Sequence, residues 1–320
     1  MDDLQEGKDI ETKSSRPNSS QAVLHLFLGI LFFLGSMMVL AAVAIYICSY
    51  MVSGTVGSVE DGAAVVASLT SHPYALKLFV FLSSSLPLIV GVLITLYVMK
   101  ANARDFLLLN FPKNVKWFGL SVLFVFIAIP LMGMFLEINK LLDFSQWPDF
   151  NNWLLKQESA NNGTYEAMIG EKSTLSFITS LLFMALIPAI AEEIFFRGFL
   201  MNVFNGVFKN MHLSILVTAV IFSLIHMQFM KFLPMMFLAI VFGYAAYWTG
   251  SIWTSIVAHF ANNALAVSQL YFFTDGDYDK ALEQGANFPI IANVGIAIVV
   301  AALFWYIQNN SNTKTQNFYV

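Results

Sequence analysis

Apolar windows of about 20 residues recur along almost the whole chain of 320 residues and restrict its fold more than any other feature. A bilayer core of roughly 30 Å takes about 20 apolar helical residues to cross. About eight such windows can be marked, at residues 23–51, 75–99, 117–138, 173–196, 213–228, 232–248, 251–270 and 288–307. Since spanning segments of this kind bond their backbone groups internally as helices, the sequence predicts an all-α, polytopic transmembrane helical bundle.

The composition supports a membrane protein and argues against several other classes. Hydrophobic residues make up 58% of the chain and charged residues only 11%, far from the balance of a soluble domain. A net charge of -4 provides no basic field, so no nucleic-acid partner is expected. The single cysteine, Cys48, rules out a disulfide framework or a thiolate metal cluster within one chain. We expect a multi-pass integral protein of a plasma or inner cell membrane, surrounded by membrane lipid.

Lysine and arginine residues set the expected orientation. They gather in the N-terminal tail and the second connection, at positions 8, 13, 16, 100, 104, 113 and 116, whereas the first connection carries Glu60 and Asp61 and no basic residue. Because cytoplasmic loops carry the excess of basic residues, both termini are predicted to be cytoplasmic. The connection at 139–172, rich in Asn, Glu and Asp, and the acidic segment 274–285 are then expected to lie on the outer side of the membrane.

The sequence divides into four regions, which differ in whether their spans contain unusual polar residues. Residues 1–20 are expected to be a disordered cytosolic tail, and residues 21–172 an N-terminal three-span region with an outer loop and no unusual polar residue in its spans. Residues 173–270 form the expected functional core, and residues 271–320 a second outer loop, the last span and a short tail. Within the core, apolar residues at helical spacing between 198 and 212 predict an amphipathic helix at the cytoplasmic interface.

The stretch AEEIFFRGFL, residues 191–200, places Glu192, Glu193 and Arg197 at the end of an apolar run. Ionisable groups at membrane depth are costly and usually mark a functional cavity, although all three could instead cap a helix end at the lipid headgroups. On a helix Glu193 and Arg197 are four residues apart, so they are expected to pair. Glu192 lies about 100° around the helix from Glu193 and is predicted to face a cavity.

Two further spans carry polar residues at the same four-residue spacing. The segment FSLIHMQ has Phe222 and His226 on one helix face, and AHFANNA has His259 and Asn263 on another. Taken alone, each set could serve packing or hydrogen bonding between helices. If the three sets converge, they form a polar chamber that holds a carboxylate, two imidazoles and an amide.

Such a chamber would have the groups that peptide hydrolysis requires: an activated water, donors for the oxyanion and a proton for the leaving amine. Glu192 and His226 are the candidates to hold and deprotonate the water, and His259 and Asn263 are the candidates to bind the oxyanion. A zinc-dependent protease is the competing interpretation, because Glu and His are good zinc ligands, although the H-E-x-x-H spacing is missing.

These motifs resemble those of the CAAX protease and bacteriocin-processing (CPBP, or Abi) family, which includes the Ras-converting CAAX endopeptidase. The family pattern of E-E-x-x-x-R, F-x-x-x-H and H-x-x-x-N is matched in order from Glu192, from Phe222 and from His259. The flanking segments FRGFL and TGSIWTSIVAH are also similar to the family's. The resemblance extends over about residues 173–270 and identifies that core as the catalytic region.

The resemblance implies an intramembrane, glutamate-dependent endopeptidase of eight helices, with a chamber open to the cytoplasm and with no metal or other cofactor expected. It gives water activation to Glu192 and His226 and the oxyanion site to His259 and Asn263. Supporting roles fall to the remaining motif residues, Glu193, Arg197 and Phe222. The implied partner is a peptide or protein substrate, with lipidated CAAX tails among the candidates.

Two other classes of function stay open at this point. A proton-coupled transporter would use the buried Glu and His as a relay, but it predicts internal repeats in the two halves, and the N-terminal half lacks matching polar residues. A non-catalytic immunity or scaffold protein would bind a partner through the same chamber. The window limits also raise a difficulty: Glu192 and His226 differ in depth by about 15 Å at 1.5 Å per residue, unless the fourth helix continues past Arg197.

Overall fold

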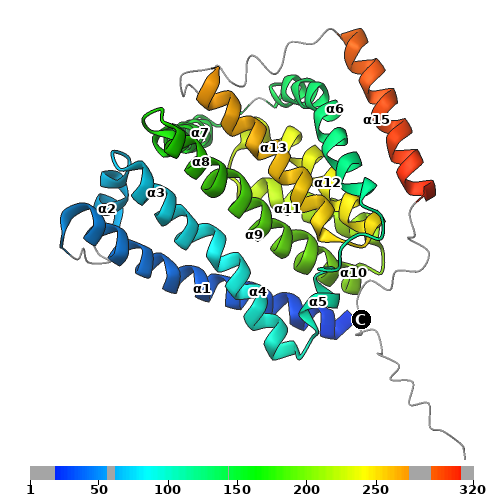
Figure 1. Cartoon of the computed structure of the whole chain (residues 1–320), viewed down its shortest axis with the longest axis horizontal. Coiled ribbons are helices and arrows are strands. Elements are labelled where there is room, and N and C mark those ends of the chain that lie inside the picture. The colour runs from blue at the N-terminus through cyan, green and yellow to red at the C-terminus, as the bar shows by residue number, and fades with distance from the viewer. Residues whose placement is uncertain (1–18, 56–61, 143, 274–289, 311–320) are drawn as a thin grey trace, which may run out of the picture.

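The computed structural model describes residues 19–55, 62–142, 144–273 and 290–310, and this part of the chain is helical without any β-strand (Figure 1). The N-terminal helices are α1 (Ser19–Ser53), α2 (Gly62–Leu69), α3 (Pro73–Val80), the π-helical turn η2 (Phe81–Ser85), α4 (Leu86–Met99), α5 (Ala103–Phe106), α6 (Lys116–Asn139) and α7 (Pro148–Ile169). The others are α8 (Thr174–Ser180), the π-helical turn η3 (Leu181–Leu186), α9 (Ile187–Glu193), the π-helical turn η4 (Ile194–Leu200), α10 (Met201–Phe208), α11 (Met211–Ile225), the 3-10 turn η5 (Phe229–Lys231), α12 (Phe232–Thr249), α13 (Ile252–Phe272) and α15 (Ile290–Asn310).

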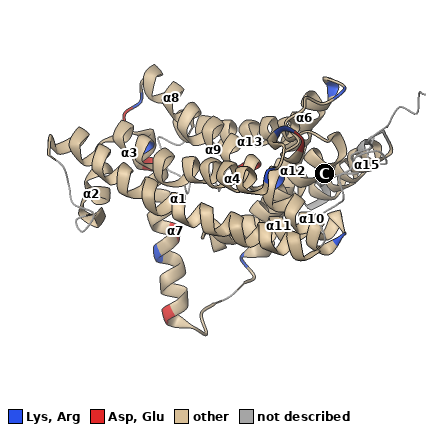
Figure 2. Ribbon diagram, turned by 90° about the horizontal axis from the view of Figure 1, so that it is seen from below, with Lys and Arg blue, Asp and Glu red and all other residues tan. Residues whose placement is uncertain are grey.

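The prediction of a polytopic helical membrane protein is confirmed, and each apolar window of the sequence overlaps a helix of the described residues. In the described residues, 5 helices are long and apolar enough to cross a bilayer: Ser19–Ser53, Pro73–Met99, Lys116–Asn139, Thr174–Phe208 and Phe229–Thr249. Met211–Ile225 and Asn293–Tyr306 are shorter apolar helices. Charged residues are sparse along the bundle (Figure 2). The cytoplasmic location of both termini stays a prediction.

The segments α8, η3, α9, η4 and α10 form one helix of 35 residues, Thr174–Phe208. The predicted interfacial helix at 198–212 is therefore wrong, because its residues Phe199, Leu200 and Val203 are buried in the core rather than laid on a membrane surface. The continuation past Arg197 places Glu192 near the middle of the helix. This position removes the difference in depth that the window limits had suggested between Glu192 and His226.

A short hairpin of α11 and α12 enters the bundle beside this long helix. Asn210 caps the start of α11 by accepting a hydrogen bond from the Leu213 N–H at 3.2 Å. At the far end, α12 stops at Gly250, whose φ of 66° suits the left-handed conformation that ends many helices. Because α11 has only 15 residues, the turn between the two helices lies inside the bundle rather than beyond it.

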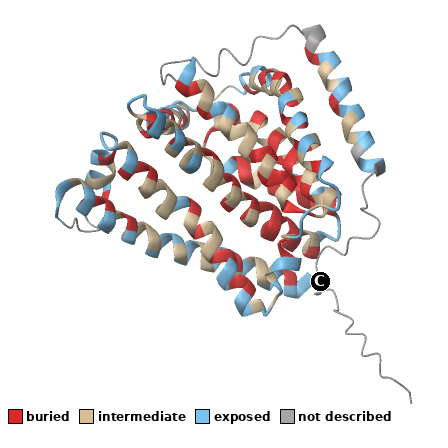
Figure 3. Ribbon diagram, viewed as in Figure 1, coloured by how far each residue is buried: buried red, intermediate tan, exposed pale blue. Residues whose placement is uncertain are grey.

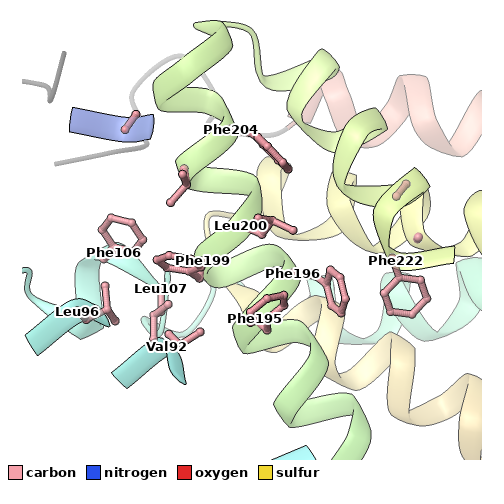
Figure 4. Close-up of a cluster of buried hydrophobic side chains, with 14 residues drawn as sticks. Val92, Leu96, Phe106, Leu107, Phe195, Phe196, Phe199, Leu200, Phe204 and Phe222 are labelled. Atoms are coloured by element: carbon pink, nitrogen blue, oxygen red, sulfur yellow. The ribbon is translucent and has the colours of Figure 1, made fainter. Parts of the chain in front are cut away.

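The buried core lies where α4, the 106–107 segment, η4, α10 and α11 meet (Figures 3 and 4). It is rich in phenylalanine rings, with Phe195 and Phe196 in edge-to-face contact at 5.1 Å and Phe196 and Phe222 at 4.9 Å. Outer helices such as α1 expose most of their apolar side chains, as lipid contact allows (Figure 3). The core therefore fixes the helix that carries Glu192 against α11.

Two expectations for the N-terminal region need correction. Lys77 of α3 is an unusual polar residue in a span: it is 1% exposed, and its ammonium donates to Thr179 Oγ1 at 2.9 Å. The expected outer loop contains a helix of 22 residues, α7, which runs across the direction of the bundle helices (Figures 1 and 2). Because α7 is polar, a search of the sequence for apolar windows does not detect it. Residues 1–18 of the expected tail and the acidic segment 274–285 lie outside the described residues.

The division of the chain into an N-terminal region and a catalytic core stays a prediction. Within the N-terminal region, two helices pack closely. Helices α1 and α4 cross at Gly91, where a β-carbon would lie 2.7 Å from the Phe33 Cα. Small residues allow the backbones of membrane helices to approach in this way.

We expect Gly91→Ala to destabilise the protein by about 2 kcal/mol, because the added methyl group forces the two backbones apart. The measurement is unfolding in mixed micelles with an increasing fraction of denaturing detergent. Gly35→Ala on α1 is the control, since no atom lies within 4 Å of the added carbon. Equal stability of the two variants would show that the α1 and α4 crossing tolerates expansion.

Candidate active site

The three sequence motifs meet in the middle of the bundle. Glu192 and Glu193 end α9, and Arg197 lies in η4, one turn further along the same long helix. His226 follows the last residue of α11 directly, and His259 lies on α13. Segments far apart in the sequence thus bring one arginine, two carboxylates and two imidazoles together.

Glu193 and Arg197 form the expected ion pair, with Arg197 Nη1 2.7 Å from Glu193 Oε1. Both side chains are sealed from solvent, at 0% and 1% exposure. The arginine also donates from Nη2 to the carbonyl oxygen of Ala239 on α12 at 2.9 Å. A buried charge is tolerated only with partners of this kind, so the pair locks η4 to α12.

Glu192 faces away from this pair, as its position on the helix predicts. Its side chain is 18% exposed, in contrast to Glu193. The Oε2 atom lies 3.8 Å from His226 Nε2 and 3.7 Å from His259 Nε2. Among the described residues, this oxygen has no hydrogen-bond partner although it is buried. Two imidazoles therefore converge on one carboxylate oxygen without bonding it directly.

His226 has a fixed orientation. Its Nδ1 is 2.6 Å from the carbonyl oxygen of Phe222, which can only accept, so Nδ1 carries the proton and donates it. In the neutral ring Nε2 is then an acceptor, and it is the nitrogen that faces Glu192. The Phe222 ring centroid lies 4.4 Å from that of His226. The backbone of α11 thereby selects the tautomer of the histidine that ends it.

His259 is fixed by a carboxylate rather than by a carbonyl group. Its Nδ1 lies 2.8 Å from Glu193 Oε1, the same oxygen that pairs with Arg197. Its ring stacks on Phe242 at 4.9 Å with an angle of 20° between the planes. The Nδ1 proton is therefore committed to Glu193, and Nε2 points toward Glu192.

Asn263 is the one motif residue that this contact network does not include. It lies one turn beyond His259 on α13, about 6 Å along the helix axis. Its Oδ1 accepts a hydrogen bond from Asn262 Nδ2 at 3.2 Å, and in the described part of the chain no direct bond joins it to the other motif residues. Its place in the oxyanion site therefore stays a prediction.

Two residues around the site, Phe242 and Ser255, were missed by the sequence patterns. Phe242 and the motif residue Phe222 flank the Arg197 guanidinium at 5.4 and 5.0 Å, in the geometry of cation–π contacts. Ser255 is buried beside Glu193, and its hydroxyl donates to the Ile252 carbonyl at 2.9 Å. Its spacing of four residues before His259 is a signal that could have found it, whereas nothing in the sequence singles out Phe242.

Metal ligation was the competing interpretation of the Glu and His residues. In the part of the chain that the structure describes, no group of three His, Cys, Asp or Glu side chains has a geometry suited to a metal ion. Two of the four imidazole nitrogens at the site are already bonded, to Phe222 and to Glu193. The other two nitrogens, both Nε2, face Glu192, and a chelator experiment tests the zinc interpretation.

Comparison with known proteins gives matches that include the site. Residues 174–265 match the family model described as "Type II CAAX prenyl endopeptidase Rce1-like", a range that holds all the motif residues. The chain is also similar to "Uncharacterized protein YpbD" of Bacillus subtilis (strain 168), at 22% identity over 177 residues, which are 53% of this chain and 78% of that protein. No solved structure matches the chain.

Replacing Arg197 by methionine should destabilise the fold by about 3–5 kcal/mol, because Glu193 would keep a buried negative charge without its main partner. Detergent-induced unfolding in mixed micelles measures the loss. The double variant Arg197→Met, Glu193→Gln should recover part of it. Lys140→Met is the control, because it breaks an exposed pair with Glu137 and should change stability by at most about 1 kcal/mol. A loss of that small size at Arg197 would contradict the assignment.

Proposed function

Because the chain belongs to the family of Rce1-like CAAX endopeptidases, we propose that it hydrolyses peptide bonds inside the membrane by a glutamate-dependent mechanism. Glu192 and His226 activate the water, and His259 and Asn263 bind the oxyanion. The substrates are peptides or proteins, with lipidated CAAX tails as the first candidates. The plasma or inner cell membrane is the proposed location.

One observation carries the proposal: Glu192 Oε2 is placed 3.8 and 3.7 Å from the Nε2 atoms of two histidines. Those separations are too long for direct hydrogen bonds and suit a bridge through one water molecule. The partial exposure of Glu192 supports access from a cavity, whereas Glu193 is sealed. Two neighbouring carboxylates thus have environments suited to different tasks.

The nucleophilic water is held by two acceptors. His226 Nε2 has a lone pair because Nδ1 donates to the Phe222 carbonyl, and Glu192 Oε2 is an acceptor as the carboxylate. A water at about 2.8 Å from both atoms donates one proton to each. As the water attacks the scissile carbonyl carbon, Glu192 takes a proton from it and acts as the general base.

The oxyanion forms on the side of α13. His259 Nδ1 already donates to Glu193, so Nε2 can donate to the oxyanion only when the ring is the doubly protonated imidazolium. The Glu192 and Glu193 carboxylates and the Arg197 and His259 cations then balance in charge. The Asn263 amide supplies the second donor. Glu192, now protonated, gives its proton to the leaving nitrogen, and the peptide bond breaks.

Glu192→Gln should abolish cleavage, because the amide can neither take the proton from water nor return it. The measurement is cleavage of quenched-fluorescent peptides by the purified protein in liposomes, with prenylated CAAX peptides and their unprenylated forms side by side. Circular dichroism and the unfolding transition should match those of the wild type. Glu137→Gln, at an exposed pair, is the matched control and should keep full activity.

Three outcomes of this assay would contradict the proposal, and each leads to a different conclusion. Turnover by Glu192→Gln would rule out Glu192 as the base. Loss of wild-type activity on addition of a strong zinc chelator, with recovery by zinc, would identify a metal enzyme. No cleavage of any peptide by the wild type would favour a non-catalytic binding protein.

Asn263→Ala should lower kcat by about 100-fold with little change in KM, as the loss of one oxyanion donor does in other hydrolases. Asn262→Ala is the comparison, because Asn262 contacts only its neighbour's side chain oxygen in this network. We expect it to lose less than about tenfold, through a less well oriented Asn263. Equal losses in both variants would remove Asn263 from the oxyanion site.

A further inference from the structure

The tip of the α11–α12 hairpin, residues 226–231, has a strained backbone conformation. Directly after His226, Met227 has a φ of 55°, a left-handed conformation that is uncommon for residues other than glycine. Such conformations persist where surrounding contacts determine them, and they cluster at functional sites. Asn139 at the end of α6 supplies two of these contacts, by donating to the Phe229 carbonyl at 2.8 Å and accepting from the Leu233 N–H at 2.9 Å.

Helix α7 supplies further contacts. It crosses the bundle beside this tip and starts with Pro148, a residue suited to the first turn, while Gly170 ends it. Glu158, Asn162 and Tyr165 lie on one face of α7, at spacings of four and three residues. All three side chains interact with the segment 228–231 of the tip. A helix outside the sequence motifs therefore holds the turn that carries His226.

Lys231 is the first anchor point. Its side chain is buried, forms an ion pair with Glu158 and donates to Asn162 Oδ1 at 3.3 Å. The ring of Trp153 lies 6.2 Å from that of Phe229 beside them. A lysine inserted into the bundle would be unfavourable without these partners, so Glu158 fixes how α7 sits on the tip.

Tyr165 is the second anchor point. Its phenol is buried beside the side chain of Gln228, two residues after His226, and lies close enough to Glu192 for the carboxylate charge to act on it. Burial and the negative charges of Glu192 and Glu158 raise the pKa of Tyr165 above its ordinary value, although the neighbouring Gln228 side chain opposes the rise. The phenol therefore stays protonated at neutral pH and remains a hydrogen-bonding group.

We propose that Tyr165, together with Glu158 and Asn162 on the same face of α7, is a positioning residue for the hydrolytic reaction: through Gln228 and Lys231 these side chains hold the strained turn that aims His226 Nε2 at Glu192. Helix α7 is then a working part of the active site rather than a surface connection. The proposal rests on the function proposed above for its consequences in catalysis. The geometry of His226 can be tested without any substrate.

Tyr165→Phe removes only the hydroxyl group, and we expect it to lower kcat about tenfold with KM unchanged, as the loss of outer-shell support does elsewhere. The probe is the peptide of the liposome assay that the wild type cleaves fastest. Tyr97→Phe is the matched control, because Tyr97 is 84% exposed on α4, and it should keep wild-type kinetics. Wild-type kcat in Tyr165→Phe would overturn the proposal.

A second measurement separates this proposal from the proposed function. In protein labelled with ¹⁵N at histidine and held in lipid nanodiscs, the ring nitrogens of His226 report which tautomer is present. At an alkaline pH, where the neutral ring is observed, the wild type should show a single tautomer with the proton on Nδ1, and Tyr165→Phe should show a mixture. This result would stand even if no peptide were cleaved. An unchanged single tautomer in Tyr165→Phe would contradict the positioning role.

The ion pair allows a rescue experiment. Glu158→Lys and Lys231→Glu should each lower kcat about tenfold or more, and the double variant that exchanges the charges should restore most of the activity. The same exchange at the exposed pair of Glu137 and Lys140 is the control and should change nothing. Single variants with wild-type kcat, or a double variant no better than the singles, would show that α7 does not act on the tip through this pair.

Discussion

A single sealed carboxylate, Glu193, organises the centre of this protein. Its Oε1 atom pairs with Arg197 at 2.7 Å and with His259 Nδ1 at 2.8 Å, so one oxygen joins the long helix to α13. Arg197 adds the connection to α12 through the Ala239 carbonyl. Removing any member would leave a charge or a donor without a partner in a region that excludes water, which is why the whole set is interdependent.

This network separates two adjacent glutamates by environment. Glu193 is completely enclosed and balanced by a cation, whereas Glu192, one residue earlier, keeps 18% of its side chain exposed between two histidines. The π-helical turn that begins at Ile194 lies immediately after them, and such turns are frequent at functional sites. Consecutive residues of one helix therefore have different roles: Glu193 holds the neighbouring helices in place, and Glu192 is the accessible carboxylate.

The position of the second histidine depends on helix length. Because α11 has 15 residues, His226 ends it at the depth of Glu192 rather than at the outer surface. The turn that follows is held by contacts from α6 and α7, two helices that carry none of the motifs. Active-site geometry in this bundle therefore depends on packing by segments whose sequences give no catalytic signal.

The sequence by itself determined the helical membrane fold, because continuous apolar windows leave no other way to satisfy the backbone in lipid. It also determined the pairing of Glu193 with Arg197 and the separate direction of Glu192, since both follow from residue spacing on one helix. Only the tertiary structure decided how far the long helix extends, how deep His226 lies, and that Phe242, Ser255, Lys231 and Tyr165 belong around the site. Those outcomes arise from contacts between segments distant in the chain, and local hydropathy carries no information about such contacts. The polar helix α7 is the clearest case, because its hydrogen bonds and ion pair with the hairpin tip, rather than its own composition, give it a place in the bundle.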